Sequence, residues 1–176
     1  LVDHAAKTSV MAESIPDNGG VFFVPAFTGL GAPHWNTGAR GMIIGITAAT
    51  SKEQITRAAL ESMAYQTRDL LEEMERNSGI KLKELKVDGG ASKNDFLMQF
   101  QADILNCRVV RPKDIETTAL GACYLAGLGC GIFKSEDEIK ELWEADRVFE
   151  PQMDEETREN LYAQWCKAVE KSKDWL

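Results

Sequence analysis

Val87-Asp88-Gly89-Gly90-Ala91-Ser92-Lys93-Asn94 is the junction from which the architecture of this chain can be worked out: a strand ends, two glycines turn the chain, and a helix begins. Adjacent glycines can adopt positive φ and place no Cβ in the way of a ligand. The first turn of the following helix exposes N–H groups that suit a nucleotide, and the amide of Asn94 both donates and accepts hydrogen bonds. Such a turn is more often only a tight connection, and Asn94 alone is more often a solvated helix-start residue. The junction by itself therefore leaves both interpretations open.

The sequence on either side of this junction alternates short apolar runs with helical periodicity. Strands are predicted at residues 21–24, 42–46, 85–87 and 107–110. Helices are predicted from 51 to Gly79, from 92 to 104, from 118 to 127 and from 135 to 143, and a last helix begins at Asp154. The order predicts an α/β layer architecture with a mixed sheet and no internal division.

Helix ends and buried faces follow from residue type and spacing. Ser51 is predicted to cap the first long helix, and Ser92 the second, with Asp95 as a capping-box acid. The spacing of apolar residues predicts that the long helix buries Leu60, Met63, Ala64, Thr67, Leu70, Leu71 and Met74. The inward face of the last helix is predicted to comprise Leu161, Tyr162, Trp165, Ala168 and Val169.

Composition bounds the function classes. The 176 residues suit one domain, and the net charge of −8 argues against broad binding to nucleic acid or to anionic membranes. No apolar run approaches the roughly 20 residues that span a bilayer. Four cysteines without a C-x-x-C pair are expected to be small hydrophobes in a reducing cytoplasm, and two separated histidines indicate no metal site. A chain that opens without Met is expected to be a piece of a larger protein.

Two further stretches resemble the FGGY family of carbohydrate kinases. Residues 41–46 (Gly-Met-Ile-Ile-Gly-Ile) followed by 54–61 (Gln-Ile-Thr-Arg-Ala-Ala-Leu-Glu) match the second signature of that family throughout. Residues 24–35 (Val-Pro-Ala-Phe-Thr-Gly-Leu-Gly-Ala-Pro-His-Trp) resemble its glycerol kinase branch, whereas its xylulokinases carry a different loop here. The resemblance continues through 65–69, 88–90, 96–105 and 117–122 to Trp165 and 167–169, and so covers nearly the whole chain.

This resemblance implies an actin-like ATPase domain of ribonuclease H type, a mixed sheet with helices on both faces. Residues 1–176 would form most of the second of two such domains. It implies transfer of the γ-phosphoryl group of ATP, with Mg²⁺, to glycerol, giving sn-glycerol 3-phosphate and ADP. It places nucleotide contacts on Gly90 and Asn94, with Gly89 supporting the turn. It also implies a cytoplasmic homodimer or homotetramer for the intact protein.

Departures from the family pattern matter equally. The N-terminal phosphate loop and the Asp-Gln-Gln type motif with the catalytic aspartate are absent, and glycerol is held by those missing parts. We therefore predict no catalytic residue and no metal ligand in this chain, and expect that alone it neither phosphorylates glycerol nor binds ATP tightly. Two alternatives stay open: a kinase for another polyol or sugar, and a non-catalytic interaction module with a degenerate kinase fold.

Other tempting residues have simpler explanations. Asp88 beside the Gly-Gly turn is expected to hydrogen-bond locally and not to act as a general base. Trp165 and Tyr162 are expected to be core residues before they are a carbohydrate-stacking set with Trp35 and Trp143. The acidic run 154–156 is expected to be a helix start in water. The matching segment docks a sugar-transport regulator in some bacterial glycerol kinases, but this sequence differs there at several positions.

Overall fold

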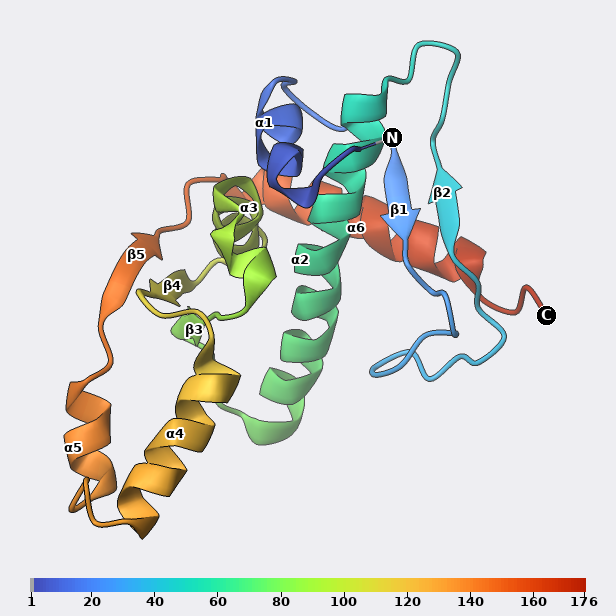
Figure 1. The fold of residues 1–176 in the computed structure, drawn as a ribbon. Helices are drawn as coiled ribbons and strands as arrows, with labels where there is room; N and C mark the ends of the chain where they lie inside the picture. The colour runs from blue at the N-terminus through green and yellow to red at the C-terminus, as the bar shows by residue number, and fades with distance from the viewer. Residues whose placement is uncertain (1) are drawn as a thin grey trace.

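A computed structural model describes residues 2–176, and Figure 1 shows their arrangement. The elements in chain order are a 3₁₀ turn Ala5–Lys7, α1 Thr8–Glu13, β1 Phe22–Val24, β2 Met42–Ile44, α2 Lys52–Ser78, β3 Glu84–Lys86, a 3₁₀ turn Gly90–Lys93, α3 Asp95–Leu105, β4 Arg108–Pro112, α4 Thr117–Gly129, α5 Glu136–Glu141, β5 Ala145–Phe149 and α6 Glu155–Ser172. All the predicted strands and helices are present, with ends that differ by a few residues.

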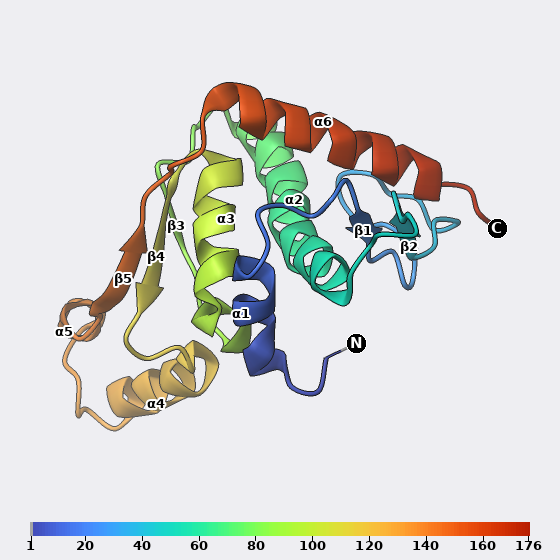
Figure 2. The same ribbon diagram turned by 90° about the horizontal axis from the view of Figure 1, so that it is seen from above.

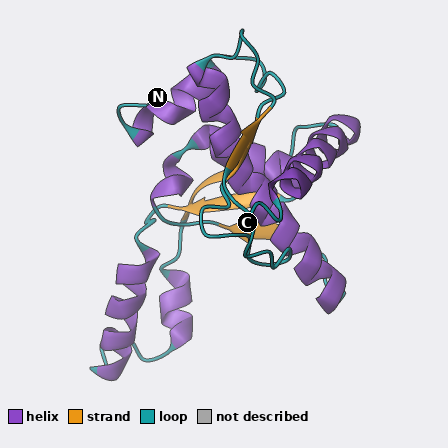
Figure 3. Ribbon diagram, turned by 90° about the vertical axis from the view of Figure 1, so that its right-hand side faces the viewer, coloured by secondary structure: helices purple, strands orange, loops and turns teal. Residues whose placement is uncertain are grey.

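The long helix α2 runs between two small sheets, as Figures 1 and 2 show. On one side β1 and β2 pair antiparallel, with Phe23 opposite Ile43. On the other side the strand order is β3-β4-β5, in which β3 is parallel and β5 antiparallel to β4. Helix α3 lies between this mixed sheet and α2, and α6 crosses α2 (Figure 2). The predicted mixed α/β architecture, with sheets flanked by helices, is confirmed; Figure 3 shows the two sheets by colour.

Two elements were not predicted from the sequence. The strand β5 exposes all its residues except Phe149, so its side chains lack the apolar alternation that marks a half-buried strand. Helix α1 is only six residues long and buries only Ala12. Both elements are held in place by residues that are distant in sequence, and the spacing of apolar residues within an element cannot indicate such contacts.

The core forms where α2, α3, α6 and the strands meet. Tyr65 stacks on Trp165 with ring centroids 5.2 Å apart, and Phe100 meets Tyr65 edge-on. Trp165 is 1% exposed, which confirms that it is a core residue. Rings of this size dominate the apolar area that such a core removes from water.

The predicted buried face of α2 is wrong in part. Leu60 and Ala64 are buried, but Met63, Leu70 and Met74 are 46%, 43% and 56% exposed. The helix instead buries Glu61 and Asp69, because each carboxylate finds hydrogen-bond donors inside the protein. Apolar spacing alone cannot identify a polar residue that is buried with its partners.

The ends of α2 agree with the predictions. The Ser51 side chain accepts from the Gln54 backbone N–H, and the Gln54 side chain accepts from the Ser51 backbone N–H, which completes a capping box. Gly79 follows the helix with φ of 71°, in the left-handed region that favours glycine.

Helices α4 and α5 project from the rest of the molecule (Figures 1 and 3). Helix α4 carries no charged residue, yet Gly127 is its only buried residue among those that the structure describes. None of the helices in residues 2–176 is both long and apolar enough to cross a membrane.

Candidate functional site

The Gly-Gly turn assigns different tasks to its two glycines. Gly89 has φ of 74° and ψ of 177°, a conformation available essentially only to glycine. Its N–H donates to the Ile115 carbonyl at 2.9 Å, which fixes the turn against the segment before α4. Gly90 has no positive φ, and a Cβ built on it meets no atom within 4 Å. The chain itself therefore requires glycine at 89 and leaves open space beside 90.

Asn94 caps α3, which corrects the prediction that Ser92 does so. Its Oδ1 accepts from the Leu97 backbone N–H at 3.0 Å. Ser92 instead lies in the 3₁₀ turn, where its hydroxyl donates to the Gly89 carbonyl at 2.7 Å. Asp95 does not complete a capping box but accepts from Arg111 at 2.7 Å. The two glycines insert this extra turn before the helix, so the helix begins later than the Ser-x-x-Asp spacing indicates.

Asp88 is engaged locally, as expected. Its carboxylate accepts a hydrogen bond from the Thr117 hydroxyl at the start of α4. This contact ties the end of β3 to α4.

Gly90 and Asn94 line one cavity of about 580 Å³. Its wall is mainly apolar and comes from α1 and the turn before it, from α2 and from the junction; the lining residues are His4, Ala5, Ala6, Thr8, Ser9, Leu60, Met63, Gly90, Ala91, Lys93, Asn94 and Leu97. Gly89 is not in the lining and shapes the turn from behind. The structure thus brings two of the three predicted site residues to a common space.

The contribution of residues 4–9 to this cavity was missed. Sequence reasoning placed no element there, because this short segment has neither a strong cap nor a buried stripe. Its position is set by contacts that are distant in sequence: the Ser9 hydroxyl accepts from the Phe96 backbone N–H on α3 at 3.4 Å, and Arg57 on α2 donates to the carbonyls of Ala12 and Ile15, at 3.3 and 2.7 Å.

The four aromatic residues considered as a stacking set do not come together in a site. Trp35 is 78% exposed, Trp165 is buried, and Trp143 lies under the ammonium of Lys86, which is 4.1 Å from its ring centroid. Tyr162 donates from its hydroxyl to Asp69. The indole N–H of Trp165 donates to the same Asp69 carboxylate, so these two residues share one packing contact, but the four rings form no common stacking face.

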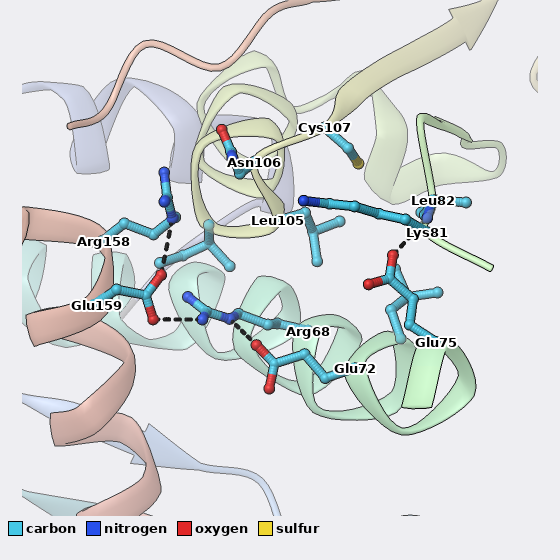
Figure 4. A pocket seen from close by; sticks show the side chains of 12 residues that line it. Arg68, Glu72, Glu75, Lys81, Leu82, Leu105, Asn106, Cys107, Arg158 and Glu159 are labelled. Atoms are coloured by element: carbon cyan, nitrogen blue, oxygen red, sulfur yellow. Dashed lines mark hydrogen bonds and ion pairs between the residues drawn. The ribbon is translucent and has the colours of Figure 1, made fainter. Parts of the chain in front are cut away.

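A second, smaller cavity of about 170 Å³ lies between α2, α6 and the end of α3, and Figure 4 shows its lining. Four of its charged groups are paired with one another: Arg68 contacts Glu72 and Glu159, each at 2.6 Å, and Arg158 contacts Glu159 at 3.0 Å (Figure 4). The hydrogen bond from Arg68 holds the pKa of Glu159 below its usual range. The cavity contains none of the predicted site residues.

The described residues offer no set of protein ligands for a metal ion. Across residues 2–176, no three His, Cys, Asp or Glu side chains gather in a way that would hold one. Cys107 is buried, which raises the pKa of its thiol, and the four cysteines are free.

Comparison with known proteins gives a consistent result. Residues 2–130 match the model of the FGGY family of carbohydrate kinases, C-terminal domain. The chain is 60% identical over 174 residues to glycerol kinase 2 of Sulfolobus acidocaldarius and 61% identical over 176 residues to the glycerol kinase of Pseudothermotoga lettingae. These matches take in 99% and 100% of this chain, but the chain spans only 35% of the length of each relative.

Solved structures agree. The glycerol kinase of Plasmodium falciparum with ADP superposes with a TM-score of 0.87 at 40% identity, over 97% of this chain and 34% of that one. The gluconate kinase of Lactobacillus acidophilus gives 0.79 at 27% identity, over 96% and 35%. The fold is thus that of these sugar kinases, as the actin-like expectation required. Through its match to the C-terminal domain, this chain belongs to the FGGY family of carbohydrate kinases.

Proposed function

We propose that the intact protein is an ATP-dependent glycerol kinase and that residues 1–176 are most of its C-terminal domain, which supplies one wall of the nucleotide site. The observation that carries the proposal is that Gly90 and Asn94 line one cavity of about 580 Å³. The glycerol kinases at about 60% identity support the choice of reaction. The solved relative with ADP supports the choice of nucleotide.

The cavity fits a nucleobase and its ribose in size and chemistry. Leu60, Ala91 and Leu97 offer apolar surface to a planar base, and Asn94 adds a polar group at the rim. Open space beside Gly90 lets a ligand approach the backbone closely.

The phosphoryl-transfer step would take place outside this chain's residues. In that step the oxygen of a glycerol hydroxyl forms a bond to the γ-phosphorus of ATP, the bond to the β–γ bridging oxygen breaks, and the hydroxyl proton passes to a base. We assign that base to the Asp-Gln-Gln type motif of the family, which lies outside residues 1–176, and not to Asp88, which contacts Thr117. We propose Mg²⁺ as the ion that accompanies ATP in the intact protein, where it would supply charge neutralisation on the phosphates.

Binding of ADP to the intact protein tests the nucleotide site. Gly90→Val fills the space into which no atom of this chain extends, so it is expected to weaken ADP binding at least tenfold without loss of stability. Asn94→Ala is expected to weaken ADP binding about tenfold and also to lower stability by about 1 kcal/mol, because it removes the cap of α3.

Gly129→Val is the matched control, because Gly129 also has free space around its Cβ position and lies outside the cavity. Calorimetric titration with ADP, with thermal melting alongside, gives both readouts. Unchanged ADP affinity in Gly90→Val and in Asn94→Ala would contradict the site.

A panel of glycerol, other polyols and sugars tests the substrate, and the absence of any turnover would favour the interaction module. An assay of residues 1–176 alone tests the prediction that this part is inactive. We also propose a cytoplasmic location and a homodimer or homotetramer, which cell fractionation and light scattering test.

A further inference from the structure

We propose that Thr8 is a positioning residue, which sets the orientation of the Asn94 amide so that its NH₂ group, and not its oxygen, is turned toward the nucleotide cavity. This inference rests on the proposed nucleotide site. It concerns how that site is held in place.

The hydroxyl of Thr8 has a fixed role. It donates its single proton to the Ala5 carbonyl at 2.7 Å. Toward Asn94 it can therefore only accept, and the group that it meets there at 3.1 Å is Nδ2. A donor is required at this position, so the amide nitrogen of Asn94 faces Thr8 because of hydrogen-bond chemistry.

The opposite side of the amide is fixed independently. The backbone N–H of Leu97 is a donor, and it meets Asn94 Oδ1 at 3.0 Å. An inverted amide would face this N–H with its own NH₂ and would face the accepting Thr8 oxygen with its carbonyl. Both contacts would be lost together, so the two neighbours select the same orientation.

One amide proton of the Asn94 side chain is left for a ligand. An amide NH₂ carries two protons, and only one of them is directed to Thr8. Among residues 2–176 the other proton meets no acceptor, while Oδ1 already accepts from Leu97. The side chain is thus prepared to donate, which suits a ring nitrogen of a purine base.

Thr8 can hold Asn94 in this way because α1 is itself anchored. Arg57 donates to the carbonyl of Ala12, in the last turn of α1, and to that of Ile15, just after the helix. Arg57 also pairs with the buried carboxylate of Glu61 at 2.8 Å. The Ser9 hydroxyl also accepts from the backbone N–H of Phe96 at 3.4 Å. Helix α1 is therefore a fixed support beside the first turn of α3.

The test is ADP titration of the intact protein, with Thr8→Val, Thr8→Ser and Asn94→Ala alone and Thr8→Val combined with Asn94→Ala. Thr8→Val keeps the shape but removes the hydroxyl, and is expected to weaken ADP binding about five- to tenfold. Thr8→Ser keeps the hydroxyl and is expected to stay within about twofold of wild type. In the Asn94→Ala background, Thr8→Val is expected to add less than about twofold, because there is no amide left to orient.

Lys7→Ala is the matched control, because Lys7 lies next to Thr8 in the chain but outside the cavity, paired with Asp3 at 3.1 Å. Thermal melting of each variant separates loss of binding from loss of folding. If Asn94→Ala weakens ADP binding but Thr8→Val binds ADP as the wild type does, the role of Thr8 is overturned and the nucleotide site stands. A Thr8→Val effect that persists at full size without Asn94, or that Thr8→Ser shares, would also overturn it. An unchanged affinity in Asn94→Ala would instead refute the proposed site.

Discussion

Replacing Asp69 by alanine tests the contact that joins three distant parts of the chain. This side chain on α2 accepts from the indole N–H of Trp165 at 2.9 Å and from the Tyr162 hydroxyl at 2.7 Å, both on α6. It also contacts His34 Nε2 at 3.1 Å, in the loop after β1. Asp69 is 6% exposed, so water cannot take its place as acceptor without rearrangement.

The magnitude follows from the exposure of the donors. Trp165 is 1% exposed, and a buried donor left without an acceptor costs about 1–3 kcal/mol. Tyr162 and His34 are partly exposed and can turn to water, so each contributes about 0.5–1 kcal/mol. The free energy of unfolding is therefore expected to fall by about 3 kcal/mol. With a slope of about 2 kcal/mol per molar urea, the midpoint falls by about 1.5 M.

Equilibrium urea unfolding followed by circular dichroism measures this change. Asp137→Ala is the matched control, because Asp137 is an exposed helical aspartate with a single surface ion pair, and its midpoint is expected to stay near that of wild type. In the double variant with Tyr162→Phe, the two losses are expected to be less than additive, since both remove the same hydrogen bond. A loss below about 1 kcal/mol in Asp69→Ala, or full additivity, would refute this account of the contact.

Three further predictions concern α2. Burial raises the pKa of Glu61 against the opposing hydrogen bond from Arg57, so the folded state holds this proton more tightly than the unfolded state. The stability that protonated Glu61 contributes is fully present below the ordinary carboxyl pKa and is lost as pH rises through the pKa of the folded state. The urea midpoint of Glu61→Gln should therefore rise relative to that of wild type as pH rises. A difference between the two midpoints that stays constant with pH would contradict this. The Tyr65 hydroxyl is buried and has no hydrogen-bond partner among the described residues, so Tyr65→Phe is expected to leave the free energy of unfolding unchanged or raise it by about 1 kcal/mol; a clear loss would show that the hydroxyl is satisfied. Gly79→Ala places a Cβ at φ of 71° and is expected to cost about 1 kcal/mol by the same assay, whereas no loss would show that the helix end relaxes.

Local signals in the sequence predicted those parts of the fold that depend on local chemistry. The cap of α2 and its glycine stop were found because each depends on residues within one turn of the helix. The strands β1 and β4 were found because they are short apolar runs between turn signals.

The features that sequence reasoning missed depend on partners distant in the chain. Glu61 is buried because Asn18, 43 positions away, donates to it at 2.7 Å, and no local pattern indicates this. Asn94 was singled out as a ligand contact, but its second task as the cap of α3 was missed, because Ser92 offered a more conventional cap. The contribution of α1 to the cavity wall was also missed, because α1 itself is held in place by residues distant in the chain.

On the proposed nucleotide site, the first glycine of the junction would serve the fold and the second would serve the ligand. A side chain at position 89 strains the backbone by about 1–3 kcal/mol, so variants there are expected to be scarce among well-folded proteins. A side chain at position 90 extends into unoccupied space and leaves the fold as it was. An experimenter who needs a stable protein that has lost only its ligand, as a control in cells or as a scaffold for engineering, should therefore alter the second glycine and keep the first.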